Sequence, residues 1–212
     1  MNRRFLQILS YVFVVALAVT CYFSVFPPTG GAHATADTQS IMPADKMQEL
    51  VDYCKAHNLY AHRIIIVDFA IRSSQPRFFV VNTKSRAIEL QSKCASGSGS
   101  DNSYPPKFSN EPGSNCSSIG HFAVVVKRRM NTRRLNSFVL NGLDSTNSNA
   151  HQRGILIHPS HTVDAYADSA NALIPASSQV SSGCFAIESA AMSKLEAIFA
   201  KADRPMLLYA FF

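Results

Sequence analysis

Four consecutive β-branched residues, Ile64 to Val67, constrain the fold more than any other feature of this chain. Such side chains pack well on a pleated sheet, and the run leaves no polar face, so it predicts a buried strand within residues 63–71. Apolar runs at residues 78–81 and 87–90 follow it, separated by the turn-forming residues 82–85. These three runs predict neighbouring strands of one sheet.

Further elements follow from the apolar pattern along the rest of the chain. Helical spacing of apolar residues predicts one helix from Pro43 to about Asn58 and another over residues 188–201. Four more apolar runs predict strands at residues 122–127, 135–140, 154–157 and 206–212. Long polar loops occupy residues 95–119, 144–152 and 159–181. Residues 43–212 are therefore expected to form a single mainly β (α+β) domain, a mixed and mostly antiparallel sheet with two or three helices.

The N-terminus carries an export signal. Arg3 and Arg4 precede an apolar run over residues 5–26, and two small-x-small motifs follow within residues 32–36. Residues 1–34 fit a cleaved signal peptide, and the run is also long enough for a membrane anchor; the motifs beyond helix-breaking Pro and Gly favour cleavage. Residues 35–42 read as a polar linker. We expect an exported protein of the periplasm or cell envelope, attached to the inner membrane if residues 5–26 are retained.

Net charge restricts the partners. The whole chain has a formal charge of +6, and without Arg3 and Arg4 it has 18 basic and 14 acidic residues, a charge of +4. This excess could favour an anionic polymer of the envelope, although net charge alone is better explained by an ordinary solvated surface. It is too small to indicate nucleic-acid binding, and no groove-reading motif is present.

Export affects whether the cysteines are expected to form disulfides. Cys21 lies in the apolar run, which leaves Cys54, Cys94, Cys116 and Cys184 in the domain. Thiols tend to pair in an oxidising compartment, and a Cys94–Cys116 disulfide would close a loop of 21 residues, restraining the unfolded chain by about 3 kcal/mol. The sequence leaves three connectivities open, including a Cys54–Cys184 pair. No Cys or His spacing indicates a zinc site.

Cys184 is the candidate nucleophile. Gly183 permits a tight turn and close approach to a substrate carbonyl, and backbone N–H groups of Gly183 and Cys184 would stabilise an oxyanion. His158 ends an apolar strand 26 residues upstream and is the candidate base, with His161 as the alternative. Local pattern alone equally fits a small buried cysteine.

Several motifs occur in the order that resembles the murein L,D-transpeptidase catalytic domain family, which has the YkuD-like fold. His158 is followed downstream by the Ser-x-Gly-Cys element of residues 181–184. The other matching motifs are residues 67–69, 78–82, 108–114, 117–120, 141–144 and 153–158. The resemblance covers roughly residues 45–212.

The resemblance implies a cysteine acyltransferase that remodels peptidoglycan peptide stems. Cys184 would attack an L-centred residue, typically diaminopimelate, release D-alanine and form a thioester that an amine resolves. His158 would act as base and then acid, oriented by a backbone carbonyl. Gly183 and Cys184 would donate backbone N–H groups to the oxyanion. No metal and no organic cofactor are implied.

Three residues are candidates for substrate binding: Ser182, Arg153 and His161. For Arg153, binding of a substrate carboxylate and anchoring of a loop both remain open. Pro159 follows the histidine where relatives often have Gly, and Ser182 stands where relatives often have Trp or His. These departures keep open an inactive cell-wall binding module. A hydrolytic L,D-carboxypeptidase-like enzyme is a further alternative, because the sequence does not separate transfer to an amine from hydrolysis by water.

Overall fold

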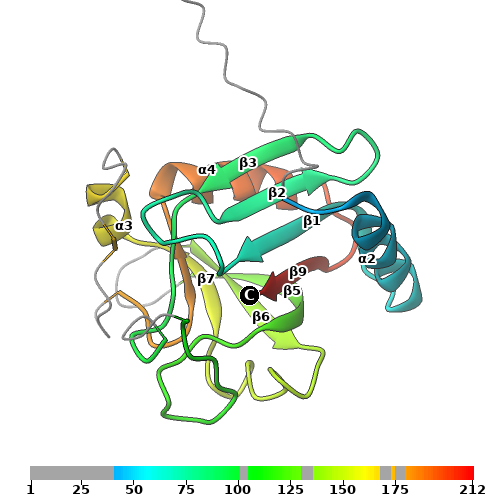
Figure 1. Cartoon of the computed structure of the whole chain (residues 1–212). Coiled ribbons are helices and arrows are strands. Elements are labelled where there is room, and N and C mark those ends of the chain that lie inside the picture. Colours follow the sequence, from blue (N-terminus) through cyan, green and yellow to red (C-terminus); the bar gives the residue numbers. More distant parts are fainter. Residues whose placement is uncertain (1–40, 101–104, 130–135, 168–172, 175–179) are drawn as a thin grey trace, which may run out of the picture. The chain divides into compact units, whose positions relative to one another are not determined.

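A computed structural model describes residues 41–100, 105–129, 136–167, 173–174 and 180–212 (Figure 1). The predicted signal or anchor and nearly all of the predicted linker lie outside these residues. In chain order the elements are α2 (Ala44–Ala56), β1 (Tyr60–Asp68), β2 (Phe78–Asn82), β3 (Ile88–Ser92), β4 (Cys94–Ala95), β5 (Gly120–Arg129), β6 (Asn136–Gly142), β7 (Leu156–Pro159), α3 (His161–Ala165), β8 (Phe185–Ile187), α4 (Ser189–Phe199) and β9 (Met206–Phe211). Within the described residues, no helix is long and apolar enough to cross a membrane.

The strands form one nine-stranded sheet in the order β3-β2-β1-β9-β5-β6-β7-β8-β4. Six of its pairings are antiparallel, and the β1–β9 and β7–β8 pairings are parallel. The predicted mixed, mainly antiparallel β-domain is thereby confirmed. Although β3 and β4 stand at opposite ends of this order, only Lys93 separates them in the chain. The sheet must therefore curl until its two ends meet.

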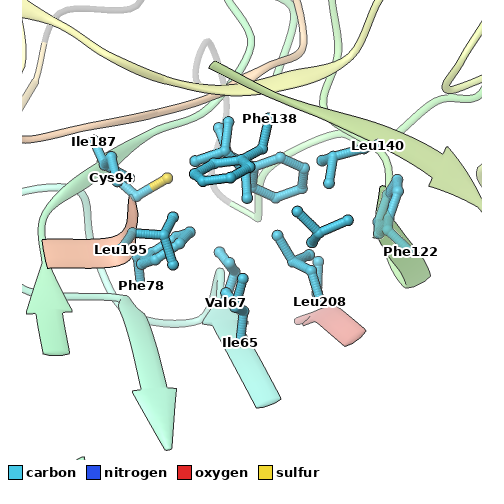
Figure 2. Packing of buried hydrophobic residues seen from close by; sticks show 14 of the residues in the cluster. Ile65, Val67, Phe78, Cys94, Phe122, Phe138, Leu140, Ile187, Leu195 and Leu208 are labelled. Carbon is cyan, nitrogen blue, oxygen red and sulfur yellow. The ribbon is translucent and has the colours of Figure 1, made fainter. Parts of the chain in front are cut away.

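The inside of the curled sheet is the main core. All nine strands contribute side chains to it, as does α4 through Ala191, Met192 and Leu195. Figure 2 shows part of this core, with side chains such as Phe78, Phe138 and Leu208 converging from different strands. Burial of so much apolar surface is the main stabilising contribution to a domain of this size.

Two smaller clusters cover parts of the outer face. Helix α2 packs Met47, Leu50 and Cys54 against β1, where Ile64 and Ile66 point outward while the alternate residues of β1 point into the main core. The run of β-branched residues is buried because both of its faces are covered. Helix α3 lies on the outer face near β8 and β4, where Val163 packs with Ala95 and Ala186.

Two local predictions were wrong. Helix α3 lies inside the segment 159–181 that was expected to be a loop, and β4 includes Ala95, the first residue of the loop expected over residues 95–119. The Cys94–Cys116 disulfide is not formed. Cys94 faces the main core from β4, whereas the sulfur of Cys116 lies beside Gly99. Spacing along the chain does not reveal that the two side chains have different neighbours.

The alternative Cys54–Cys184 disulfide is also not formed. Cys54 is fully buried on the face of α2 that packs against the sheet, and burial raises the pKa of its thiol to about 12. Cys184 lies beside β7 instead, on a different part of the sheet. Cys54 is therefore a core residue, as its place on the first helix predicts.

Candidate active site

The parallel pairing of β7 with β8 brings the candidate nucleophile and base to one face of the sheet. Ile157 pairs with Phe185 and His158 with Ala186, and both Ile157 and Phe185 point into the main core. Because side chains alternate along a strand, His158 points to the outer face. Cys184 directly precedes β8 and lies across from Leu156, two residues before His158.

The sulfur of Cys184 is held by backbone groups of the neighbouring segment. Leu156 donates its N–H to Sγ at 3.4 Å, and Sγ lies 3.6 Å from the carbonyl oxygen of Gly154. Burial raises the pKa of this thiol, while the Leu156 N–H and the charge of Arg153 act in the opposite direction. The resting group is therefore a thiol, and forming the nucleophilic thiolate requires a base.

His158 is oriented by a backbone carbonyl. Its Nδ1 lies 2.9 Å from the carbonyl oxygen of Pro159. A carbonyl only accepts hydrogen bonds, so Nδ1 carries a proton, and in the neutral ring Nε2 is the basic nitrogen. This is the arrangement that a general base needs, and the orienting group is a carbonyl, as the family resemblance implies.

His161 occupies a different environment. It begins α3, its side chain is 82% exposed, and its Nδ1 lies 3.6 Å from a carboxylate oxygen of Asp164. Asp164 in turn accepts hydrogen bonds from Ser189. His161 is a surface histidine of α3, whereas His158 is half-buried on the sheet.

The turn before Cys184 requires glycine at position 183. Gly183 has φ of +120°, and a Cβ there would lie 2.8 Å from the Cys116 carbonyl oxygen and 2.9 Å from Cδ1 of Ile155. Gly97 packs against the same turn, because its own Cβ would lie 2.8 Å from the Gly183 backbone. Ser182 is exposed on this turn. The candidate nucleophile is thus carried on a turn that is packed closely on its inner side.

Two buried serine hydroxyls hold the backbone of this turn. Ser181 Oγ accepts the N–H of Gly183 at 3.1 Å and donates to the carbonyl of Cys184 at 2.6 Å. Ser117 Oγ accepts the N–H of Gly97 at 2.9 Å and donates to the carbonyl of Gly183 at 3.3 Å. Sequence reasoning missed both roles; the only signal was the serine-rich loop at residues 95–119 and the serine of the Ser-x-Gly-Cys element.

Arg153 anchors the loop that lies over this region. Its Nη1 donates to Ser109 O and to Ser118 Oγ, each at 2.7 Å. Its Nη2 donates to Ser114 Oγ at 3.4 Å and to the carbonyl of Cys116. Burial lowers the pKa of the guanidinium. Of the two roles predicted for Arg153, loop anchoring is the one that these contacts describe.

The group of residues has the parts that a thiol acyl-transfer site needs: a cysteine sulfur, a half-buried histidine oriented through its Nδ1, and backbone N–H groups beside the sulfur. Among the described residues, no group of three or more His, Cys, Asp or Glu side chains is arranged to hold a metal ion.

Comparison with known proteins gives one family match. Residues 37–211 match the family described as the L,D-transpeptidase catalytic domain. No curated protein matches the chain.

Solved structures similar to this chain include an L,D-transpeptidase from Mycobacterium smegmatis, with 9% identity and a TM-score of 0.42 over 71% of this chain and 59% of that one. Another is the helical cell shape determining protein Pgp2 from Campylobacter jejuni, with 12% identity and a TM-score of 0.44 over 70% of this chain and 46% of that one. The chain thus covers about half of the length of these two proteins.

Proposed function

The chain belongs to the L,D-transpeptidase catalytic domain family, and from this premise we propose that it is an exported cysteine acyltransferase that remodels the peptide stems of peptidoglycan. Cys184 is the nucleophile, His158 the base and then the acid, and backbone N–H groups beside Cys184 stabilise the oxyanion. The substrate is a tetrapeptide stem with an L-centred residue, such as diaminopimelate, before its terminal D-alanine.

The reaction proceeds in two halves. Nε2 of His158 takes the proton of the thiol, and Sγ of Cys184 attacks the carbonyl carbon of the L-centred residue. The tetrahedral intermediate collapses, the carbon–nitrogen bond breaks, and D-alanine leaves with the proton from His158. An amine of a second stem then attacks the thioester carbonyl and His158 accepts the amine proton. The carbon–sulfur bond breaks as the new amide forms, and His158 returns the proton to Sγ, which restores the thiol of Cys184.

The placement of Cys184 relative to β7 is the observation that carries the proposal. The Leu156 N–H holds the sulfur at 3.4 Å, and His158 projects from the same sheet face two residues further along β7. The Pro159 carbonyl orients the ring of His158 through Nδ1, and Nε2 is the nitrogen proposed to take the thiol proton. Burial keeps the thiol protonated at rest, so attack depends on the histidine.

Hydrolysis is the closest alternative, because water in place of the second amine gives D-alanine release without a cross-link. The other alternative is a cell-wall binding module without catalysis, which the unusual Pro159 and Ser182 keep open. Ser182, Arg153 and His161 are the residues proposed to contact or frame the substrate, with Arg153 acting through the loop that it anchors.

The test is incubation of the purified protein with disaccharide tetrapeptides, with and without an amine acceptor. We expect release of D-alanine, a mass increase on the peptide that contains Cys184, and cross-linked product when the acceptor is present. The control is Cys184→Ala, which should abolish all three. Equal D-alanine release by wild type and Cys184→Ala would contradict the proposal; release without cross-links would indicate the hydrolytic enzyme. Binding to cell-wall sacculi without release would indicate the binding module.

A further inference from the structure

We propose that Ser117 is a positioning residue that directs the backbone N–H of Cys184 at the oxyanion formed during acyl transfer. The inference rests on the proposed role of Cys184 as an acyl-transfer nucleophile, and it adds a residue from a distant loop to that site. It also selects Cys184, and not Gly183, as the residue whose N–H stabilises the oxyanion.

The hydroxyl of Ser117 is fully buried and makes two hydrogen bonds. Oγ accepts the N–H of Gly97 at 2.9 Å and donates its proton to the carbonyl of Gly183 at 3.3 Å. The backbone of Ser117 is itself fixed, because its N–H donates to Ser100 Oγ at 2.9 Å. The hydroxyl therefore links the turn at Gly97 to the turn that carries the nucleophile.

Through the peptide bond between Gly183 and Cys184, this contact sets the direction of the Cys184 N–H. In a planar trans peptide, the C=O and the following N–H point in opposite directions. Ser117 holds the Gly183 carbonyl toward the buried side, so the N–H of Cys184 points away from Ser117. Within the described part of the chain, this N–H has no protein acceptor.

The other N–H group of the turn is already used. Gly183 donates its N–H to Ser181 Oγ at 3.1 Å, and Ser181 is itself buried. A hydrogen bond from Gly183 to an oxyanion would require this contact to break. The N–H of Cys184 needs no such change, and preorganised donors of this kind are the ones that stabilise a transition state.

The chemical consequence is limited to reactions that form an oxyanion. When Sγ of Cys184 attacks a carbonyl carbon, the sulfur–carbon bond forms and the π electron pair moves to oxygen, where the Cys184 N–H stabilises it. Collapse restores the carbonyl and expels the leaving group. Alkylation by iodoacetamide replaces iodide at a saturated carbon and forms no oxyanion. Ser117 should therefore matter for acylation and not for alkylation.

The experiment compares both reactions in the full chain, with p-nitrophenyl acetate as the acyl probe and iodoacetamide as the alkylating probe. Modification is followed by the mass of the peptide that contains Cys184. The variants are Ser117→Ala, which removes the hydroxyl, Ser117→Thr, which retains it, and the control Ser92→Ala. Ser92 is also buried, but its hydroxyl bonds to Lys93 O and Glu188 at the far end of β8. Thermal unfolding checks that each variant is folded.

We expect the ratio of acylation rate to alkylation rate to fall about tenfold or more in Ser117→Ala. This fall should be smaller than the loss of about 10²- to 10³-fold that follows removal of a whole oxyanion donor. Ser117→Thr should restore most of the ratio, and Ser92→Ala should leave it within about twofold of wild type. The ratio is decisive because a general loosening of the site changes both rates together.

An unchanged ratio in Ser117→Ala, or an equal fall in Ser92→Ala, would overturn the inference. So would a wild-type Cys184 that reacts with iodoacetamide but is never acetylated. The p-nitrophenyl acetate reaction does not depend on peptidoglycan, so the two proposals fail separately. Acetylation that depends on Ser117 without turnover of tetrapeptides would retain the inference and contradict the proposed substrate.

Discussion

Leu156 donates its backbone N–H to the sulfur of Cys184 at 3.4 Å, one residue before the first pair of β7 and β8, which is Ile157 with Phe185. The parallel pairing of the two strands therefore determines where the proposed nucleophile lies. The contact also favours the thiolate, against the effect of burial, which raises the pKa of the thiol. Substitutions near this pairing should consequently show which residues affect the reaction rate and which affect the free energy of unfolding.

Replacing each histidine in turn identifies the base. His158→Gln should lower kcat for D-alanine release by about 10²- to 10⁴-fold, because the thiol then has no general base. The matched variant His161→Gln should change KM at most, since this side chain is exposed on α3. Steady-state kinetics on tetrapeptide stems measures both. A larger loss of kcat in His161→Gln than in His158→Gln would reverse the assignment.

Alanine at Gly183 should destabilise the domain as well as inactivate it. A non-glycine residue at positive φ costs about 1–2 kcal/mol, and at Gly183 the new Cβ also lies 2.8 Å from the Cys116 carbonyl. Gly113 is the control, because it has φ of +80° but no atom lies within 4 Å of the place that a Cβ would take. Urea unfolding should show Gly183→Ala less stable than Gly113→Ala by about 1–3 kcal/mol, the usual cost of overpacking. Equal stabilities would contradict the crowding around Gly183.

Much of the fold could be predicted because its strands are apolar and β-branched. The order of the strands could not. β1 pairs with β9 across most of the domain, and β3 and β4 are neighbours in sequence but lie at opposite ends of the strand order. These arrangements depend on long-range packing, which a local pattern does not record. The prediction of a Cys94–Cys116 disulfide was wrong for a similar reason, since the length of a loop does not show which way its side chains point.

The candidate site was predicted in part. The family motifs led to Cys184 and His158, but the serine hydroxyls around the nucleophile turn were missed. In the loop of residues 95–119, serine is so frequent that no periodicity distinguishes Ser117 from the others. Ser96, Ser100 and Ser118 are buried as well, so the structure distinguishes Ser117 by its hydrogen bond to the Gly183 carbonyl.

Replacement of Arg153 should loosen the loop that it anchors. Arg153→Lys keeps the positive charge but cannot reproduce the fork of hydrogen bonds to Ser109, Ser114, Cys116 and Ser118. Hydrogen exchange should be faster for the backbone amides of residues 109–118, by about ten- to a hundredfold if 1.4–3 kcal/mol of local stability is lost. The control is Arg63→Lys, which alters the Arg63–Glu89 pair on β1 and β3. If exchange in residues 109–118 were as fast in Arg63→Lys, the anchoring role of Arg153 would be wrong.

Alkaline pH should destabilise the domain through Cys54. Its pKa is about 12 in the folded state, whereas an unfolded cysteine titrates near 8.5. Below about pH 8.5 the thiol is protonated in both states, so its contribution is fully present. Above that pH only the unfolded state loses the proton, and the free energy of unfolding should fall by about 1.4 kcal/mol per pH unit until the folded thiol also titrates. Urea unfolding under reducing conditions at pH 7.5 and 10.5 should show a loss about 2.7 kcal/mol greater in wild type than in Cys54→Ala. The variant has its own cavity cost, but that cost is present at both pH values and cancels in the comparison. Equal losses in the two proteins would mean that Cys54 is not protected from ionisation by the packing of α2 on β1.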